Sequence, residues 1–211
     1  MTNVYSPWGP QPLNDNRPPL MIGLTGLRNV GKSTVAKMLV EEHGFEGVHP
    51  YEGGKVAAAA FFEYVTGDFE TAQKMVYGDL KDVPSPHLPD GVSPRFFMEK
   101  DGHFRGATLG LAWTLGLEIS IARRRAPRAP IVVESIVYEA DWFKAQGGLV
   151  VRLERPGHLG PAGVESDGVQ ALVAADATIS ATTVGELRAK ARAVVEGLAG
   201  GLPIDRFAQA G

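Results

Sequence analysis

The chain has no cysteine among its 211 residues. This absence excludes disulfide frameworks, thiolate zinc sites and thiol nucleophiles, and it favours a reducing, cytoplasmic compartment. Five histidines do not favour a metal site built from histidine alone. Apolar runs of the ~18 residues needed to span a membrane are also lacking, and residues 1–19 have neither the basic start nor the apolar centre of a signal peptide. We therefore expect a cytoplasmic protein with no membrane partner.

A strong charge of one sign is lacking too. The formal net charge of −3 argues against general coating of a nucleic acid. Glycine and proline, in contrast, are abundant: 26 and 15 residues, about 19% of the chain against an average of ~12%. Five of the prolines fall in residues 1–19, which we expect to form a flexible arm. Residues 20–199 are predicted to form one domain, and residues 200–211 a loose tail.

Short apolar runs alternate with helical patterns along residues 20–199. The expected strands are 20–25, 45–49, 131–133, 149–153 and 176–180, and the expected helices are 31–42, 55–65, 94–100, 108–125, 138–146 and 184–198. The run at 131–133 has no alternating polar face, as expected for a strand that is covered on both sides in a parallel sheet. Residues 66–93 show no clear element; they hold two glycine-containing turns, and VPSPHLPDG (83–91) is interpreted as loop because of its three prolines. The alternation predicts an α/β fold, a doubly wound parallel sheet of about five strands with helices on both faces.

The strongest motif is Gly26-Leu27-Arg28-Asn29-Val30-Gly31-Lys32-Ser33-Thr34, which has the spacing of a phosphate-binding loop, or P-loop. The glycines let successive backbone N–H groups point inward at phosphate oxygens, and the following helix adds the partial positive charge of its N-terminus. Lysine at this position reaches the β- and γ-phosphates, and the serine hydroxyl ligates Mg²⁺. The motif predicts an ATP and Mg²⁺ site of the P-loop NTPase type, with donor-binding residues Gly26, Asn29, Val30, Gly31, Lys32, Ser33 and Thr34.

Among P-loop proteins, the sequence favours a small kinase. A GTPase would need Asn-Lys-x-Asp and Asp-x-x-Gly strings, and neither occurs in the chain. A motor ATPase would normally end a strand in aspartate, whereas here the comparable residue is Glu134. In a kinase, the acceptor must lie in line with the γ-phosphate, at the carboxyl ends of the strands.

Two carboxylates and three arginines are candidates for the chemistry. Glu52 follows the second expected strand and Glu134 the third, so both are expected at the edge of the sheet that carries the loop. Either could activate an acceptor or hold Mg²⁺, and Glu134 is the candidate metal ligand beside Ser33. The competing interpretation for each is a carboxylate at the N-terminus of the next helix. Guanidinium groups bind phosphate oxygens in a bidentate manner, which makes candidates of Arg95, Arg152 and Arg155.

Three further features have a functional and a structural interpretation. Arg123, Arg124, Arg125 and Arg128 resemble a nucleic-acid patch, but they precede a strand and are interpreted as charges at a helix C-terminus. Phe96 and Phe97, beside Arg95, are candidates for stacking on a base. His158, after Arg155-Pro156-Gly157, is a candidate lid residue; a loop histidine of this kind is more often simply solvated.

With these motifs, the chain resembles the phage-type deoxynucleoside monophosphate kinases over about residues 20–195. PYEGGK (50–55) is similar to the family's Phe-Ala-Asp-Pro-Leu-Lys, and GVSPRFFME (91–99) to its Ser-Pro-Arg helix. EADWFKAQGGLVVRLERPG (139–157) is the most specific segment and leads into the family's lid. The resemblance implies phosphoryl transfer from ATP to a deoxynucleotide, with Lys32, Glu52, Glu134, Arg95 and Arg155 as catalytic residues and Arg152 at the cofactor. It also implies an acceptor-binding insertion at 66–106 and a lid-like loop at 155–172.

The departures from this family fall on the acceptor side. Where the family tends to have Gly-Thr-Glu, this chain has Gly102-His103-Phe104, and where it has Asp-Val-Arg, this chain has Glu134-Ser135-Ile136, so one arginine is missing. This leaves two alternatives open: a kinase that phosphorylates a hydroxymethyl-pyrimidine in phage DNA, or a catalytically silent nucleotide-binding regulatory module. If the protein is phage-encoded, the compartment is the host cytoplasm. The sequence leaves a homodimer open and does not define base preference.

Overall fold

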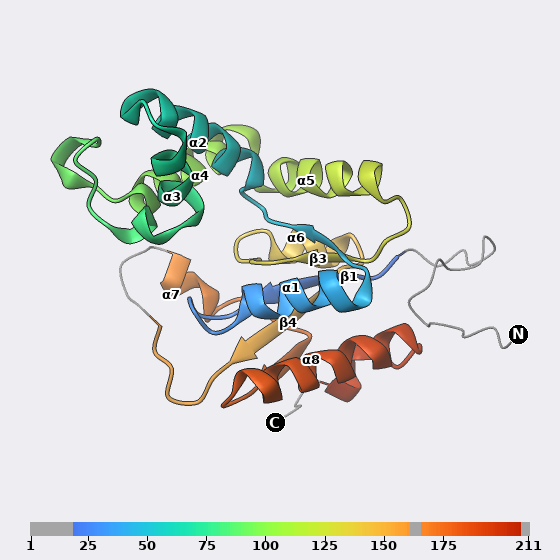
Figure 1. Cartoon of the computed structure of the whole chain (residues 1–211). Coiled ribbons are helices and arrows are strands. Elements are labelled where there is room, and N and C mark those ends of the chain that lie inside the picture. Colours follow the sequence, from blue (N-terminus) through green and yellow to red (C-terminus); the bar gives the residue numbers. More distant parts are fainter. Residues whose placement is uncertain (1–18, 161–165, 208–211) are drawn as a thin grey trace, which may run out of the picture. The chain divides into compact units, whose positions relative to one another are not determined.

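The computed structural model describes residues 19–160 and 166–207, in two compact units (Figure 1). The sheet unit contains the chain up to Pro50 and from Ile119 onward, and the helical unit contains Tyr51–Glu118. All but the last residue of the expected N-terminal arm lies outside the described residues. No helix of the described segments is long and apolar enough to cross a membrane.

The sheet unit is built on five parallel strands. They are β1 (Met21–Thr25), β2 (Glu46–Val48), β3 (Ile131–Val133), β4 (Leu149–Glu154) and β5 (Ala177–Ser180), in the order β2-β3-β1-β4-β5. In register, Ile22 pairs with Val132 on one side and with Leu149 on the other. The prediction of an α/β fold with a parallel sheet of about five strands is confirmed.

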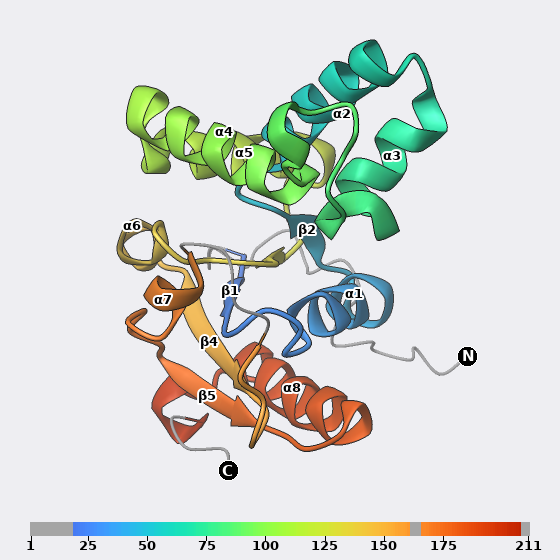
Figure 2. The same ribbon diagram turned by 90° about the vertical axis from the view of Figure 1, so that its left-hand side faces the viewer.

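Helices cover both faces of this sheet (Figure 2). On one face, Ile22 and Leu24 pack in a core with residues of α1 (Lys32–His43) and α8 (Val184–Ala199). The opposite face carries α6 (Ala140–Ala145) and α7 (Ser166–Gln170). A Cβ atom added to Gly23 would lie 3.1 Å from Ile136 and from Phe143, so the residues around α6 approach this strand closely.

The strand order places a crevice at the carboxyl end of β1. The chain leaves β1 through α1 to reach β2 on one side, and it later passes from β3 through α6 to β4 on the other side of β1. Ligands of open α/β sheets bind where neighbouring connections diverge in this way. The phosphate-binding loop occupies this position because it directly follows Thr25.

The segment after α8 is in contact with the sheet unit. The 3₁₀ turn η3 (Ile204–Phe207) places Ile204 and Phe207 against the core that α1 and α8 form with the sheet. The described part of the expected tail, residues 200–207, therefore packs on the domain; residues 208–211 lie outside the described part of the chain.

The helical unit contains α2 (Glu52–Thr66), α3 (Phe69–Tyr77), the 3₁₀ turns η1 (Asp79–Asp82) and η2 (Pro89–Gly91), and α4 (Pro94–Leu109). Helix α5 (Leu111–Arg125) begins in this unit and ends in the sheet unit. A small core joins these helices and includes Phe62, Met75 and Met98. The unit thus has its own buried centre.

One expectation about the helical unit was wrong, and one of its helices was not predicted. Residues 101–106 (DGHFRG), expected to link two helices, are helical, and the break falls at Gly110, whose φ of +87° a side chain rarely adopts. Within residues 66–93, for which the sequence predicts no clear element, the structure contains α3. The N-terminus of α3 is capped because the Asp68 carboxylate accepts a hydrogen bond from the Thr71 N–H at 2.7 Å. The buried residues of α3 are Ala72, Met75 and Val76, which have helical spacing.

Candidate active site

The phosphate-binding loop has backbone conformations that favour the glycines of its sequence. Gly26 and Gly31 have φ of +129° and +116°, and Asn29 is one of two non-glycine residues with positive φ among those described. A Cβ atom on Gly26 would lie 2.4 Å from the Leu153 carbonyl oxygen, so the first glycine of the motif touches β4 directly. The predicted use of both glycines is therefore matched by the geometry of the loop.

Positive charge gathers where the loop meets α1. Gly31 is the N-cap of α1 and offers no side chain to bond the first N–H groups of the helix, which leaves them directed at whatever lies in front of the helix. Lys32 Nζ lies 2.6 Å from the carbonyl oxygen of Gly26 and 3.0 Å from that of Leu27. An ammonium group and the N–H groups at a helix N-terminus around one loop form an anion-binding site.

Oxygen ligands suitable for Mg²⁺ lie in the same unit. Ser33 is exposed in the first turn of α1, and Glu134 directly follows β3, the neighbour of β1, with its N–H bonded to the Val48 carbonyl at 2.8 Å. No described residue pairs with the Glu134 carboxylate. Mg²⁺ usually takes one or two protein oxygens and fills its remaining positions with phosphates and water, so this donor set fits the ion. The described residues contain no cluster of three or more metal-binding side chains.

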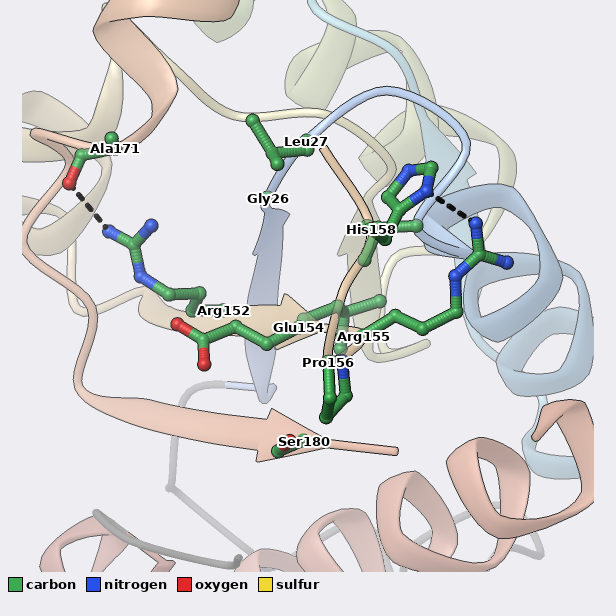
Figure 3. A pocket seen from close by; sticks show the side chains of 11 residues that line it. Gly26, Leu27, Arg152, Glu154, Arg155, Pro156, His158, Ala171 and Ser180 are labelled. Atoms are coloured by element: carbon green, nitrogen blue, oxygen red, sulfur yellow. Dashed lines mark hydrogen bonds between the residues drawn. The ribbon is translucent and has the colours of Figure 1, made fainter. Parts of the chain in front are cut away.

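Beside the loop lies a cavity of about 300 Å³ (Figure 3). Its walls come from the loop, from the end of β4 and the following turn, from the segment after α7 and from the end of β5; Leu27, Arg152, His158, Ala171 and Ser180 represent these walls. All of them belong to the sheet unit. The cavity adjoins the phosphate-binding loop, so it offers space for another part of a ligand whose phosphates bind the loop.

Arg152 forms part of this wall, and its side chain also makes several hydrogen bonds within the protein. Its guanidinium donates to the carbonyl oxygens of Gln170, Ala171 and Val173 at 3.2, 3.3 and 2.5 Å. These bonds attach the segment after α7 to β4, next to Thr25 in the register of the sheet. Arg152 therefore has a structural role in addition to the cofactor contact that we predict for it.

The turn after β4 brings Arg155 and His158 together. Arg155 Nη2 lies 2.5 Å from His158 Nδ1, and His158 Nε2 lies 2.7 Å from the carbonyl oxygen of Arg28 in the phosphate-binding loop. The histidine is half-buried rather than simply solvated. Neither contact was predicted from the sequence. The contact with Arg28 joins residues that are 130 positions apart in the chain.

Glu52 and Arg95 belong to the helical unit and have partners there. Glu52 lies in the first turn of α2; its carboxylate contacts Lys55 Nζ at 3.0 Å and accepts a hydrogen bond from the Tyr77 hydroxyl at 3.4 Å. Arg95, at the start of α4, forms a two-pronged ion pair with Asp82, one contact of which is 2.8 Å. The helical position of Glu52 matches its competing structural interpretation, and the catalytic roles of both residues stay predictions.

Some of the aromatic and basic candidates have structural contacts, whereas another stays a functional candidate. Phe97 stacks on Phe61, with ring centroids 5.0 Å apart, and packs on the core of the helical unit, so it is a core residue. Phe96 is 44% exposed and stays a candidate for stacking. In the predicted Arg cluster, Arg123 donates to the Ala129 carbonyl at 2.6 Å, and burial lowers its pKa. This contact supports the structural interpretation of that cluster.

A further half-buried network in the helical unit was not predicted. The Tyr51 hydroxyl donates to Asp101 Oδ2 at 2.7 Å, and Arg105 Nε donates to the same oxygen at 2.5 Å. Burial, and then the bond to Asp101, raise the pKa of Tyr51. The Tyr51 ring also covers Gly54, where an added Cβ atom would lie 2.0 Å from it. The sequence signal for this contact was Gly54, which leaves room for the ring.

Comparison with known proteins yields fold similarity only. No protein-family model and no curated protein matches the chain. Among solved structures, dephospho-CoA kinase from Campylobacter jejuni is similar over 86% of this chain and 98% of its own, with 14% identity and a TM-score of 0.45. TT1252 from Thermus thermophilus covers 89% and 100%, with 14% identity and a TM-score of 0.47. A gluconokinase from Sinorhizobium meliloti covers 88% and 96%, with 19% identity and a TM-score of 0.39.

Proposed function

We propose that the protein is an ATP- and Mg²⁺-dependent phosphotransferase that transfers the γ-phosphoryl group of ATP to a deoxynucleoside monophosphate. The observation that carries this proposal is the phosphate-binding loop: two glycines with positive φ, the uncapped N-terminus of α1 and Lys32 against the loop. These groups attract the phosphates of a nucleotide. The choice of acceptor rests on the sequence resemblance to phage-type deoxynucleoside monophosphate kinases.

On the donor side, the loop N–H groups and Lys32 would hold the β- and γ-phosphates, and the cavity beside the loop would take the sugar and base. Ser33 and Glu134 would hold Mg²⁺, which supplies charge neutralisation at the phosphates. Arg155 would neutralise the charge that develops on the transferring group. Positioning and electrostatics would supply most of the rate.

On the acceptor side, the bond between the γ-phosphorus and the β,γ-bridging oxygen breaks, ADP leaves, and an oxygen of the monophosphate forms the new bond to phosphorus. A phosphate oxygen carries no proton that must be removed for this step. A hydroxymethyl-pyrimidine acceptor would have to lose its hydroxyl proton to a base such as Glu52 or Glu134. Because Glu134 would also hold Mg²⁺, the variant that separates the two acceptors is Glu52→Gln, which removes a candidate base but no metal ligand.

The charge of the helical unit disfavours the DNA alternative. Residues 51–118 contain ten Asp and Glu and six Lys and Arg, a formal charge of −4. A protein that holds a DNA strand neutralises several phosphates with Lys and Arg. If the helical unit provides the acceptor site, as the predicted insertion at 66–106 implies, its net negative charge suits a small nucleotide better than a polymer.

The decisive experiment is a turnover assay with MgATP and a panel of deoxynucleoside monophosphates, followed by DNA that contains hydroxymethyl-pyrimidine. We expect ADP and labelled diphosphate with at least one monophosphate and no transfer to DNA. Transfer to DNA alone would establish the alternative acceptor, and tight ATP binding without turnover would establish the silent regulatory module.

A matched pair of lysine variants on α1 tests the site itself. Lys32→Ala should lower transfer by about 10²-fold or more, the usual effect of removing a group that stabilises charge in the transition state. Lys37→Ala, on an exposed residue that faces Glu41 at 3.7 Å on the same helix, should leave the rate unchanged. Transfer at the parental rate by the Lys32 variant would contradict every version of this active site.

A further inference from the structure

The contacts of His158 define the tautomer of its ring. A carbonyl oxygen can only accept a hydrogen bond, so the nitrogen that lies 2.7 Å from the Arg28 oxygen, Nε2, must carry a proton. A guanidinium group can only donate, so Nδ1, 2.5 Å from Arg155 Nη2, must be the unprotonated nitrogen. The two contacts therefore place a ring proton on Nε2 and make Nδ1 the acceptor, so that His158 bridges Arg155 and the phosphate-binding loop. Figure 3 shows the contact with Arg155.

The local sequence places the two partners of this bridge side by side. Residues 155–158 form a β-turn in which the His158 N–H bonds the Arg155 carbonyl at 2.9 Å. Proline at the second position and a glycine with φ of +75° at the third are the preferences of a type II turn. Because Arg155 and His158 are the first and last residues of the turn, their side chains emerge next to each other.

The chain then stays close to the phosphate-binding loop. Gly160 has φ of +68°, and a Cβ atom there would lie 3.4 Å from Leu27 Cβ and 3.5 Å from the Arg28 carbonyl oxygen. The turn and the loop therefore meet at two places, the His158 bond and the approach of Gly160. Both are next to Asn29, the one non-glycine residue of the loop with a positive φ.

We propose that His158 is a positioning residue whose two contacts, with Arg155 and with the Arg28 carbonyl, form a latch between the turn at 155–158 and the phosphate-binding loop. The latch orients Arg155 toward the phosphates of the donor nucleotide and holds the Arg28 carbonyl in place. This inference rests on the proposed function for its ligand, MgATP. The latch lies wholly in the sheet unit. Its two halves act on different partners: the Nε2–H bond shapes the loop, and the Nδ1 bond holds the arginine.

The tautomer can be tested without any nucleotide. Nitrogen-15 NMR of histidine in the full chain should show the ring of His158 as the neutral form protonated at Nε2. Arg155→Ala should shift the Nδ1 signal, and the exposed His87 should keep its signals in the same variant. A ring protonated at Nδ1 alone, or signals that do not respond to the Arg155 variant, would overturn the latch.

Two isosteric variants separate the two halves of the bridge. Glutamine places its amide nitrogen near the position of Nε2 and can still donate to the Arg28 carbonyl, but it has no acceptor for Arg155. Asparagine places its oxygen near Nδ1 and can still accept from Arg155. His158→Ala should raise the Kd for MgATP about tenfold and lower kcat, because it removes a charge-assisted and a neutral hydrogen bond.

The expected pattern is a split between affinity and rate. His158→Gln should restore most of the MgATP affinity measured by calorimetry but not kcat, and His158→Asn should restore kcat more than affinity. Leu159→Ala, at the adjacent residue that is 89% exposed, is the control and should match the parent protein. Parental affinity and rate in His158→Ala, or equal losses of affinity in the Ala and Gln variants, would overturn the proposal.

The two hypotheses can fail separately. If the parent protein bound no nucleotide, the proposed function would be wrong, and the NMR measurements would still decide whether the latch exists. If the parent bound MgATP and the His158 variants did so equally well, the proposed function would stand and the latch would be wrong.

Discussion

At the scale of single residues, Gly26 is constrained both by its backbone and by its neighbour. Its φ is +129°, and an added Cβ atom would meet the Leu153 carbonyl oxygen at 2.4 Å. Gly44, which ends α1, has φ of +68° but no atom within 4 Å of such a Cβ. Gly44→Ala should therefore cost only the conformational strain, about 1 kcal/mol, whereas Gly26→Ala should cost roughly 3 kcal/mol because the backbone must also move.

Urea unfolding and MgATP titration of these two alanine variants check this expectation. Gly26→Ala should lose nucleotide binding as well as stability, while Gly44→Ala should bind like the parent. Equal destabilisation by both substitutions would mean that the contact with β4 does not constrain the loop.

Glu139 is a buried carboxylate that contacts no cationic side chain within the described part of the chain. It gives a prediction with a definite sign. Burial raises the pKa of Glu139, and the bond that its carboxylate accepts from the Val137 N–H opposes the shift. Between the unfolded value near 4.5 and the higher folded pKa, the native state holds a proton that the unfolded state has lost, so stability falls as pH rises through this range.

Glu139→Gln removes this titration while keeping an oxygen that can accept from Val137. Relative to the parent, the variant should be more stable at pH 7 than at pH 4, as measured by urea unfolding at both values. Glu63→Gln, on an exposed residue of α2, controls for the change in net charge. A Glu139 variant whose relative stability did not depend on pH would show that the carboxylate titrates alike in both states.

The residues of the phosphate-binding loop could be predicted because their roles are local: spacing along the chain determines the turn, the lysine and the start of α1. The contacts of Glu52 with Tyr77, of Arg95 with Asp82 and of His158 with the Arg28 carbonyl could not be predicted, because each joins residues that are far apart in the chain. A site made of residues that are adjacent in the chain can be recognised as a motif in a single sequence. A site made of residues that meet only in the folded structure has no such motif.

At the scale of elements, α4 shows how glycines mislead a prediction from sequence. Gly102 and Gly106 lower the helix propensity of residues 101–106, yet the helix continues to Leu109 and stops at Gly110. A Cβ atom on Gly102 would lie 3.5 Å from the Tyr51 ring, an ordinary contact. Gly102→Ala should therefore stabilise the helical unit by roughly 0.5–1 kcal/mol.

Gly110→Ala should have the opposite effect. The break between α4 and α5 has φ of +87° and ψ of 140°, a conformation open almost only to glycine, and the strain costs about 1–3 kcal/mol. Thermal unfolding of the two variants and of the double variant checks the pair. Stabilisation by Gly110→Ala would mean that α4 and α5 can join into one helix.

The strands could be predicted more securely than the helices of the helical unit. A buried parallel strand is a short apolar run, and all five expected runs form strands. In contrast, the short α3 was hidden between turns and prolines, although its Asp68 cap and the spacing of Ala72, Met75 and Val76 are helical signals. The helical pattern of α3 is present in the sequence, but the helix is only nine residues long and was therefore hard to recognise.

At the scale of the whole molecule, the division into two units separates the predicted donor residues from part of the predicted acceptor residues. The loop, Glu134, Arg152 and Arg155 lie in the sheet unit, and Glu52 and Arg95 lie in the helical unit. The sequence did not predict this division, because the boundary at Glu118 falls inside the continuous helix α5. Each unit has its own core.

Hydrogen exchange measured by mass spectrometry should reveal this separation of roles. A ligand that binds only the native state at 100 times its Kd adds about 2.7 kcal/mol of stability, and its direct contacts slow exchange most. MgATP should protect segments 26–34 and 152–160 of the sheet unit. A cognate monophosphate should protect segments of the helical unit around Glu52 and Arg95, where the acceptor residues are predicted.

Lys32→Ala distinguishes direct protection from a general gain in stability. In this variant, MgATP should no longer protect segment 26–34, because the ammonium group that meets the phosphates is absent, while protection by the monophosphate should persist in the helical unit. If MgATP instead protected mainly α2 to α4 of the parent protein, the donor would bind the helical unit, and the assignment of donor and acceptor to the two units would be wrong.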